Sequence, residues 1–241
     1  MSIPIIPEHQ LALFLDVDGT LLEIAQTPYA VIVPESLKIT LDTLSSRLQG
    51  ALALVSGRSV ETLDALFAPY RFPAAGIHGC ELRPAGSAIE YPAVDATQLA
   101  AARDTLSTWT QRHPGTLLED KRYALALHYR LRPELETAAL DAVLPVLTQL
   151  GGVFELQRGK SVYEIRPVGY TKGSAIHSFV RAAPFAGRTP LFIGDDITDE
   201  SGFEVVNELG GVSVCVGARE PTAARYRLAN VDTVISWLGS H

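Results

Sequence analysis

An apolar run that stops at two carboxylates constrains this chain more than any other feature. Residues 11–15 read LALFL, which is typical of a parallel strand buried on both faces. Asp16 and Asp18 follow, and side chains two residues apart on an extended chain point the same way. Two adjacent negative charges need a cation or a shared proton nearby. The segment therefore predicts a metal-assisted site at the carboxyl end of a strand, where open α/β sheets bind ligands.

Composition narrows the class of protein and its partners. The chain has 241 residues, 47% hydrophobic and 20% charged, which is typical of a soluble globular protein of one or two domains. Its formal net charge of −7 offers no basic patch for nucleic acid or anionic membrane, so we expect neither partner. Cys80 and Cys215 are too few for a disulfide framework, and we expect no targeting segment. We therefore expect a monomer in the reducing cytoplasm.

Strands and helices alternate at both ends of the chain. Leucines recur at helical spacing over residues 36–49, and Ser59 can cap a short helix. Such an alternation forms a parallel sheet with right-handed crossovers. The expected elements are strands near 11–15, 51–55, 74–77, 190–193 and 212–216, helices near 36–49, 59–67, 172–182 and 231–238, and a helix ending near 209.

The middle of the chain has a different pattern. Residues 82–95 are rich in Pro, Gly and Ala and are predicted to be a connector. Strands with hairpin-like spacing then mix with helices, which predicts an antiparallel sheet backed by helices. The expected elements here are helices near 96–112 and 133–150 and strands near 116–119, 122–130, 153–157 and 161–165. We predict an α/β fold whose parallel-sheet core, residues 1–90 and 168–241, is interrupted by an inserted α+β cap, residues 91–167.

Polar residues recur where the predicted strands end or a helix begins. The carboxyl ends of parallel strands meet at one edge of a sheet, so residues distant in sequence can form one site there. Each group also has a plain structural explanation, as an ordinary turn, a surface lysine or a helix cap. Their coincidence favours a site. Besides the first two aspartates, its members are Ser56, Gly57, Arg58, Lys172, Asp195, Asp196 and Asp199.

These segments resemble a known superfamily. DVDGTL, SGR, the lysine of TKG and GDDITDE occur in the order of the four motifs of the haloacid dehalogenase-like (HAD) phosphatases. GDDITDE, GIHGCE (76–81) and GKSVYEIRPVGYTKGSA (159–175) resemble, more narrowly, the trehalose-6-phosphate phosphatase family. The resemblance implies a HAD-like Rossmannoid core with a cap. It also implies a hydrolase of trehalose biosynthesis, in carbohydrate metabolism, that uses Mg²⁺ and an aspartyl-phosphate intermediate.

The core motifs then take individual roles. We predict Asp16 as the nucleophile, because a carboxylate divides slow monoester hydrolysis into phosphoryl transfer and hydrolysis of the acyl phosphate. The resemblance implies Mg²⁺ on the Asp16 and Asp195 carboxylates and the Asp18 backbone carbonyl, which leaves the Asp18 side chain as general acid and base. The residues expected to bind phosphate are Thr20, Ser56, Gly57, Arg58 and Lys172. Those expected to orient Lys172 or metal-bound water are Asp196 and Asp199.

Sugar specificity should come largely from the inserted module, since the core chemistry is common to many phosphomonoesters. Lys160 and Glu164 are expected on one face of a strand, and His128 and Arg130 on one face of another. Several module residues equally fit a solvated sheet face. His78 with Cys80 is too small a set for a zinc site. The expected substrate contacts are His78, Glu81, Glu119, Lys121, His128, Arg130, Lys160 and Glu164.

Two alternative functions stay open. One is a related HAD sugar phosphatase, acting on sucrose phosphate or a mannosyl phosphoglycerate. The other is a non-catalytic sugar-phosphate-binding module, although the complete set of core motifs speaks against lost chemistry. A phosphomutase is disfavoured because it must retain the phosphoryl group instead of yielding it to water.

Overall fold

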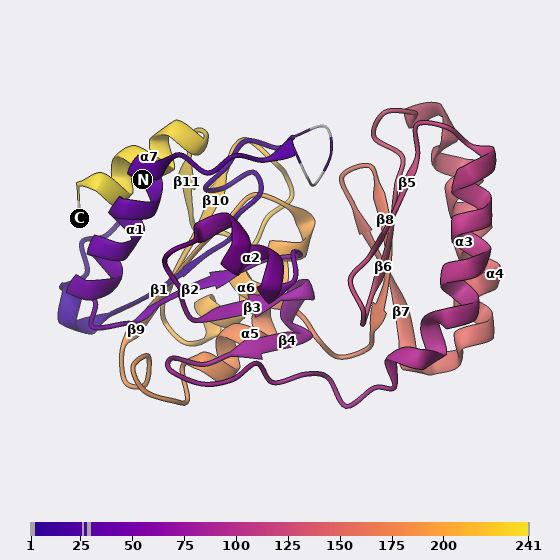
Figure 1. Cartoon of the computed structure of the whole chain (residues 1–241). Helices are drawn as coiled ribbons and strands as arrows, with labels where there is room; N and C mark the ends of the chain where they lie inside the picture. The colour runs from indigo at the N-terminus through magenta and orange to yellow at the C-terminus, as the bar shows by residue number, and fades with distance from the viewer. Residues whose placement is uncertain (1–2, 26, 28–29, 241) are drawn as a thin grey trace. The chain divides into compact units, whose positions relative to one another are not determined.

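The computed structural model describes residues 3–25, 27 and 30–240, which divide into two compact units. The first unit comprises residues 1–90 and 170–241, and the second is the insertion of residues 91–169 (Figure 1). The sequence led us to expect the insertion over residues 91–167. None of the helices in the described residues combines the length and apolar character that a membrane span needs.

A mostly parallel sheet forms the first unit. Its strands are β1 (Leu11–Leu15), β2 (Leu52–Val55), β3 (Ala74–Gly76), β4 (Glu81–Arg83), β9 (Thr189–Gly194), β10 (Val212–Val216) and β11 (Tyr226–Leu228). Within the described residues the seven strands lie in the order β11-β10-β9-β1-β2-β3-β4, and only β4 is antiparallel to its neighbour. β1 pairs with β9 and β2, so it lies inside the sheet and all its residues are buried.

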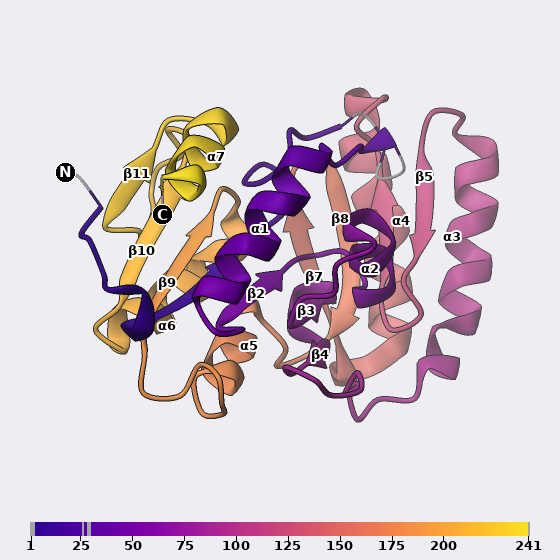
Figure 2. The same ribbon diagram turned by 60° about the vertical axis from the view of Figure 1, so that its left-hand side comes forward.

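Helices cover both faces of this sheet. They are α1 (Glu35–Arg47), α2 (Val60–Phe67), α5 (Lys172–Phe179), α6 (Glu200–Glu208) and α7 (Val231–Gly239), with short 3-10 turns η1 (Glu8–Gln10), η3 (Ile77–Gly79) and η7 (Ile197–Asp199). Figures 1 and 2 show α1 beside α7 on one face and α5 beside α6 on the other. Phe14 and Phe192 are partners in adjacent strands, and their rings lie 5.9 Å from Phe179 of α5 and 5.4 Å from Phe203 of α6. The core is therefore a sheet packed between two helical layers.

The second unit is an antiparallel sheet with helices on one face (Figure 1). Its elements are η4 (Ala96–Leu99), α3 (Ala100–Arg112), β5 (Leu117–Asp120), β6 (Leu125–His128), η5 (Pro133–Leu135), α4 (Glu136–Leu150), η6 (Gly151–Val153), β7 (Phe154–Gly159) and β8 (Val162–Pro167). Leu125 and Leu127 of β6 are buried in a core shared with α3 and α4. Directly opposed residues share a face, so Glu119 and Glu164, which both pair with Ala126, lie on the side away from that core.

The predicted fold class is confirmed, and several details were wrong. β4 overlaps the start of the segment expected to be a connector, and β11 was not predicted; each has only three residues, too few for a period-2 pattern to be seen. Gly159 pairs with Val162, so Lys160 lies in a hairpin turn and not on the strand that carries Glu164. Arg130 follows the end of β6 and shares no strand face with His128.

Candidate active site

The ends of several strands of the first unit meet at a buried lysine. Asp16 follows β1 and Asp199 follows β9, while Lys172 begins α5. The Lys172 Nζ donates hydrogen bonds to Asp16 Oδ1 at 2.6 Å and to Asp199 Oδ1 at 2.7 Å. Lys172 has only 2% of its surface exposed. The structure therefore brings together residues from separate motifs at the carboxyl edge of the sheet, as expected for an α/β ligand site.

Local sequence fixes where Lys172 begins its helix. Thr171 is the N-cap, and its hydroxyl accepts a hydrogen bond from the Ser174 backbone N–H at 3.0 Å. The Ser174 hydroxyl completes a capping box with the Thr171 backbone. Gly173 then lets α5 approach α6 closely, because an added Cβ would lie 2.3 Å from the Ser201 carbonyl oxygen. The lysine is held by its helix as well as by its charge partners.

Asp199 connects Lys172 to the loop after β9. Its Oδ2 accepts hydrogen bonds from the backbone N–H groups of Asp195 at 3.0 Å and Asp196 at 2.9 Å. Gly194 makes room, since an added Cβ would lie 2.3 Å from Asp199 Cγ. The Asp196 carboxylate instead caps η7 by accepting from the Ile197 N–H at 2.7 Å. Asp199 thus touches Lys172 directly, whereas Asp196 occupies the helix-cap role that we had considered for this segment.

The residues around Lys172 fit a divalent cation. Among the described residues, Asp16, Asp195 and Asp199 form the one group whose possible metal-ligand atoms converge, all within 4.8 Å of one another. The buried Asp195 Oδ1 has no hydrogen-bond partner in the described part of the chain. Gly19, at φ +88°, leaves this space open, because an added Cβ would lie 2.1 Å from Asp195 Oδ2. A donor set made only of carboxylate oxygens suits a hard cation such as Mg²⁺.

Electrostatics support the same interpretation. Burial and repulsion from Asp199 raise the pKa of Asp16 well above its ordinary value, although Lys172 opposes the shift. The same causes raise the pKa of Asp195 to about 7. Burial disfavours charged Lys172, yet the adjacent Asp16 and Asp199 carboxylates outweigh it and raise the lysine's pKa. Negative charge therefore exceeds positive charge in this cluster, and a bound cation would relieve the excess.

Asp18 has a different cationic partner. The Arg58 guanidinium forms a bidentate pair with its carboxylate, with Nε–Oδ2 and Nη2–Oδ1 distances both 2.7 Å. Ser56 Oγ accepts from the Arg58 N–H at 3.2 Å and helps to fix that loop. Thr20 is buried in the turn after β1, and its hydroxyl has no hydrogen-bond partner among the residues that the structure describes. The two adjacent carboxylates, which the sequence led us to expect near a cation or a shared proton, thus have different cationic partners, Lys172 for Asp16 and Arg58 for Asp18.

The expected sugar contacts of the first unit, His78 and Glu81, lie close to the segment that follows β2. Glu81 is buried, and its Oε2 accepts a hydrogen bond from the Val60 N–H at 2.7 Å. The His78 ring lies over Gly57, where an added Cβ would be 2.7 Å from Cε1 and Nε2. Both residues therefore contact the segment after β2.

The inserted unit gathers its expected sugar contacts into pairs. Glu119 Oε2 lies 2.9 Å from His128 Nε2, and Lys121 Nζ donates to Glu164 Oε2 at 3.0 Å. Burial favours the neutral form of Glu119, but the hydrogen bond from His128 and the charge of Lys121 outweigh it and lower the carboxyl pKa. These pairs belong to the sheet face that carries no helix of this unit.

Arg130 and Lys160 meet outside that paired set. The Arg130 Nη2 donates to the Lys160 carbonyl oxygen at 2.9 Å, near the turn between β7 and β8. Lys160 itself is exposed. Their contact is therefore between a side chain and the backbone of the hairpin turn.

Sequence reasoning missed Arg219. Its Nε donates to the Asp195 carbonyl oxygen at 3.2 Å, and its guanidinium pairs with Glu200. Glu200 also accepts from the Ala223 N–H at 2.7 Å. Glu200 is the last residue of GDDITDE and was not among the predicted site residues, and a single arginine in a distant loop gives no sequence signal. Arg219 therefore binds the backbone of Asp195, and Glu200 fixes the position of Arg219.

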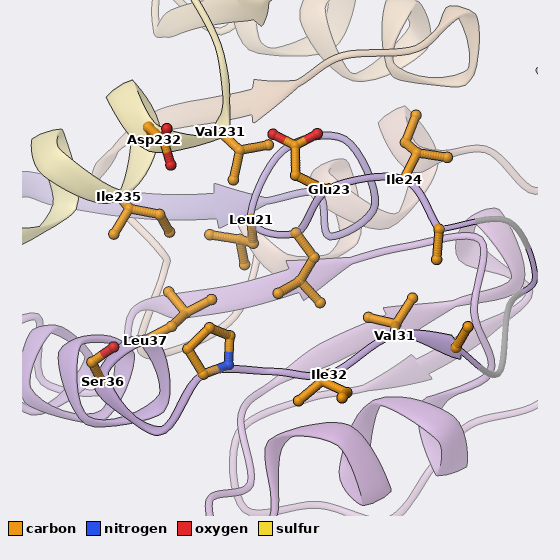
Figure 3. Close-up of a pocket in the computed structure, with 14 residues that line it drawn as sticks. Leu21, Glu23, Ile24, Val31, Ile32, Ser36, Leu37, Val231, Asp232 and Ile235 are labelled. Carbon is orange, nitrogen blue, oxygen red and sulfur yellow. The ribbon is translucent and has the colours of Figure 1, made fainter.

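A separate cavity of about 500 Å³ lies elsewhere in the first unit. Figure 3 shows its lining of mainly apolar side chains, including Leu21, Ile24 and Val31, with Ile235 contributed by α7. None of the residues discussed above lines it, as far as the described chain shows. We therefore assign no polar chemistry to this cavity.

Comparisons with known proteins agree with the site. Residues 14–232 match the sequence model of the family described as trehalose-phosphatase. The chain is 48% identical over 230 residues to the trehalose-6-phosphate phosphatase of Escherichia coli, covering 94% of this chain and 85% of that protein. It is 44% identical over 212 residues to a probable trehalose-phosphate phosphatase of Sinorhizobium fredii, covering 88% and 80%. The solved C-terminal domain of C. albicans trehalose-6-phosphate phosphatase is similar with a TM-score of 0.82 and 26% identity, over 96% of this chain and 92% of that one.

Proposed function

The chain belongs to the trehalose-phosphatase family and is a phosphatase, and from this premise we propose that it hydrolyses trehalose 6-phosphate to trehalose and phosphate with Mg²⁺ as cofactor. The family predicted from the motifs is confirmed. One observation carries the proposal: buried Lys172 bridges Asp16 and Asp199 beside Asp195 Oδ1, which has no hydrogen-bond partner among the described residues, and this arrangement suits a phosphate group and a cation.

Asp16 acts as the nucleophile in this proposal. One of its carboxylate oxygens forms a bond to phosphorus while the bond from phosphorus to the sugar oxygen breaks, which gives an aspartyl phosphate. Asp18 donates a proton to the departing sugar oxygen. It then takes a proton from the water that attacks phosphorus, while the bond from phosphorus to the Asp16 oxygen breaks, which releases phosphate and restores the Asp16 carboxylate. Arg58, which pairs with Asp18 in the structure, orients that carboxylate.

Other core residues stabilise the charge of the transferring group. Lys172 places a positive charge next to Asp16, and Asp199 keeps it there. The Thr20 and Ser56 hydroxyls and the Gly57 backbone N–H are donors for phosphate oxygens. Mg²⁺ would be held by the Asp16 and Asp195 carboxylates and the Asp18 carbonyl, and when bound it acts as a Lewis acid on a phosphoryl oxygen.

We propose that residues 91–169 act as a cap that selects the sugar, while the rest of the chain performs the chemistry. A disaccharide presents many hydroxyl groups, each of which can donate and accept. The Glu119–His128 and Lys121–Glu164 pairs supply charged donors and acceptors on one sheet face. Hydrogen bonds to charged groups are the stronger kind, so such a face can discriminate among sugars.

A phosphate-release assay tests the proposal. The purified chain should have its highest kcat/KM for trehalose 6-phosphate in a panel that includes sucrose 6-phosphate and a mannosyl phosphoglycerate. EDTA should abolish release, and added Mg²⁺ should restore it. No release from trehalose 6-phosphate, equal rates in EDTA, or a higher kcat/KM for another sugar phosphate would each contradict it.

A further inference from the structure

The GIHGCE segment contains a strained turn. Ile77, His78 and Gly79 follow one another with φ values of 48°, 55° and 107°. A positive φ is unusual for any residue with a side chain and rare for a β-branched one such as Ile77. Strain of this kind persists only where the surrounding structure holds it, and it concentrates at functional sites. The contacts of the turn therefore indicate what it is for.

Backbone hydrogen bonds join this turn to the loop after β2. The Ile77 N–H donates to the Arg58 carbonyl oxygen at 2.9 Å, and the His78 N–H donates to the Ser56 carbonyl oxygen at 3.0 Å. The His78 ring lies on Gly57, between these two contacts. The strained turn therefore contacts every residue of the Ser56–Arg58 loop, which we propose binds phosphate.

Glu81 contacts the residue at which the chain leaves the Ser56–Arg58 loop and enters α2. Its buried carboxylate accepts from the N–H of Val60, the first residue of α2. Such an N–H has no partner within its own helix, and a carboxylate there also favours the helix dipole. Gly76 permits the approach, since an added Cβ would lie 2.7 Å from the Val60 nitrogen and 2.8 Å from Glu81 Oε2. Glu81 thus fixes the point where the phosphate loop enters its helix.

The same turn also contacts the start of α5, the helix that carries Lys172. A Cβ added at Gly79 would lie 2.5 Å from the carbonyl oxygen of Thr171 and 3.4 Å from the Ala175 Cβ. Thr171 is the N-cap of α5, and Lys172 is the next residue. Only a glycine at positive φ lets the backbones come so close. One turn therefore touches both the Ser56–Arg58 loop and the start of the helix that carries Lys172.

We propose that the turn of residues 76–81 sets the Ser56–Arg58 loop and Lys172 at the spacing that a phosphate group requires, and that Glu81 is a positioning residue and not a sugar contact. The inference rests on the proposed function and deepens it. It replaces our expectation, drawn from sequence, that Glu81 binds the sugar.

Replacing Glu81 separates the two roles. Glu81→Leu leaves the Val60 N–H without its acceptor, so we expect kcat/KM to fall about tenfold, and by the same factor for trehalose 6-phosphate and for p-nitrophenyl phosphate, which has no sugar. Glu81→Gln keeps an acceptor oxygen and should recover to within about threefold of the wild type. A loss confined to trehalose 6-phosphate would show a sugar contact and overturn the proposal, as would full activity of Glu81→Leu.

A pair of glycine variants tests the contact with Thr171. Gly79→Ala and Gly86→Ala both place a side chain at positive φ, but an added Cβ at Gly86 meets nothing within 4 Å. Gly79→Ala should weaken the affinity for inorganic phosphate, measured by calorimetry, while Gly86→Ala should not. Equal affinities in the two variants would contradict the proposal.

Phosphate affinity also keeps this inference distinct from the proposed function. A wild-type chain that does not hydrolyse trehalose 6-phosphate would defeat the function, whereas the calorimetric comparison needs no turnover. Phosphate binding that is weakened in Glu81→Leu and retained in Glu81→Gln would support the positioning role in either case. Unchanged phosphate binding in Glu81→Leu would defeat it.

Discussion

The carboxylate cluster of the first unit and the polar sheet face of the inserted unit both bury charge, but they balance it differently. Asp16, Asp195 and Asp199 surround Lys172, so acids outnumber the base in this described cluster. In the inserted unit, Glu164 is matched with Lys121, whose charge also acts on Glu119, and Glu119 has a hydrogen bond with His128 that becomes an ion pair when the ring is protonated. An unbalanced cluster favours a cation, whereas balanced pairs can bind neutral hydroxyl groups without a large change in charge.

The pKa values of carboxyl groups in these two regions are shifted in opposite directions. Burial and Asp199 raise the pKa of Asp195 to about 7, which means that its ionised form lacks sufficient compensation. Glu119 is half-buried, but the hydrogen bond from His128 and the charge of Lys121 lower its pKa below the ordinary value. The carboxylate cluster of the first unit therefore needs a further positive charge, whereas the polar sheet face of the inserted unit does not.

The largest predicted effect comes from replacing Asp16, the proposed nucleophile. Asp16→Asn should lower kcat for trehalose 6-phosphate by about a thousandfold or more, because the amide cannot carry the phosphoryl group. Ligand binding should persist and can be measured by calorimetry. Asp42→Asn, which changes an exposed acid on α1 of the same unit, is the control and should turn over normally. Unchanged kcat in Asp16→Asn would exclude this residue as the nucleophile.

The polar face should affect the sugar and not the chemistry. Glu164→Gln keeps an acceptor for Lys121 but loses the charge, so we expect kcat/KM for trehalose 6-phosphate to fall about tenfold to a hundredfold. The value for p-nitrophenyl phosphate should not change. Glu134→Gln alters another acid of this unit, which pairs with Arg132 at the surface, and should be neutral for both substrates. An equal loss on both substrates would mean that the face has only a structural role.

The carboxylate cluster was predictable because simple geometry determines it. Asp16 and Asp195 each follow a long apolar strand, and parallel strands bring such positions to one edge. The helix that carries Lys172 begins at a Thr that can cap it. Local rules and chain order therefore sufficed to place these residues together.

Other features depend on contacts that no local rule contains. Lys160 lies in a two-residue turn between two strands. An error of one residue in a predicted strand boundary is enough to place it on the strand instead of in the turn. Arg58 was expected to bind phosphate, and no local pattern indicates that it pairs with Asp18, 40 positions away. The strain at Ile77 is likewise invisible in the sequence, because tertiary contacts impose it.

The dependence of stability on pH should also separate the two regions, and the chain's two tryptophans can report it. Trp237 packs on the core of the first unit and Trp109 on that of the second, so Trp109→Phe and Trp237→Phe each leave one reporter. With metal removed, Asp195 has a folded pKa of about 7 against an ordinary 3.8. The folded state then keeps a proton that the unfolded state has lost, so this stabilisation is full below the ordinary value and disappears as pH rises through 7. Asp195→Asn should reduce that fall in the Trp237 signal and leave the part that comes from Asp16, whose pKa is also raised, whereas added Mg²⁺ should reduce both parts.

Glu119 should show the opposite dependence in the Trp109 signal. Its folded pKa lies below the ordinary 4.5, so its stabilisation is present above that value and is lost as pH falls through the folded pKa. The effect should be under about 1 kcal/mol, because an ion pair near the surface contributes little. Urea unfolding from about pH 2.5 to 8 covers both slopes, and Glu119→Gln should remove only the one reported by Trp109. If both units lost stability in the same direction of pH, the contrast between an unbalanced cation site and a balanced sugar-binding face would be wrong.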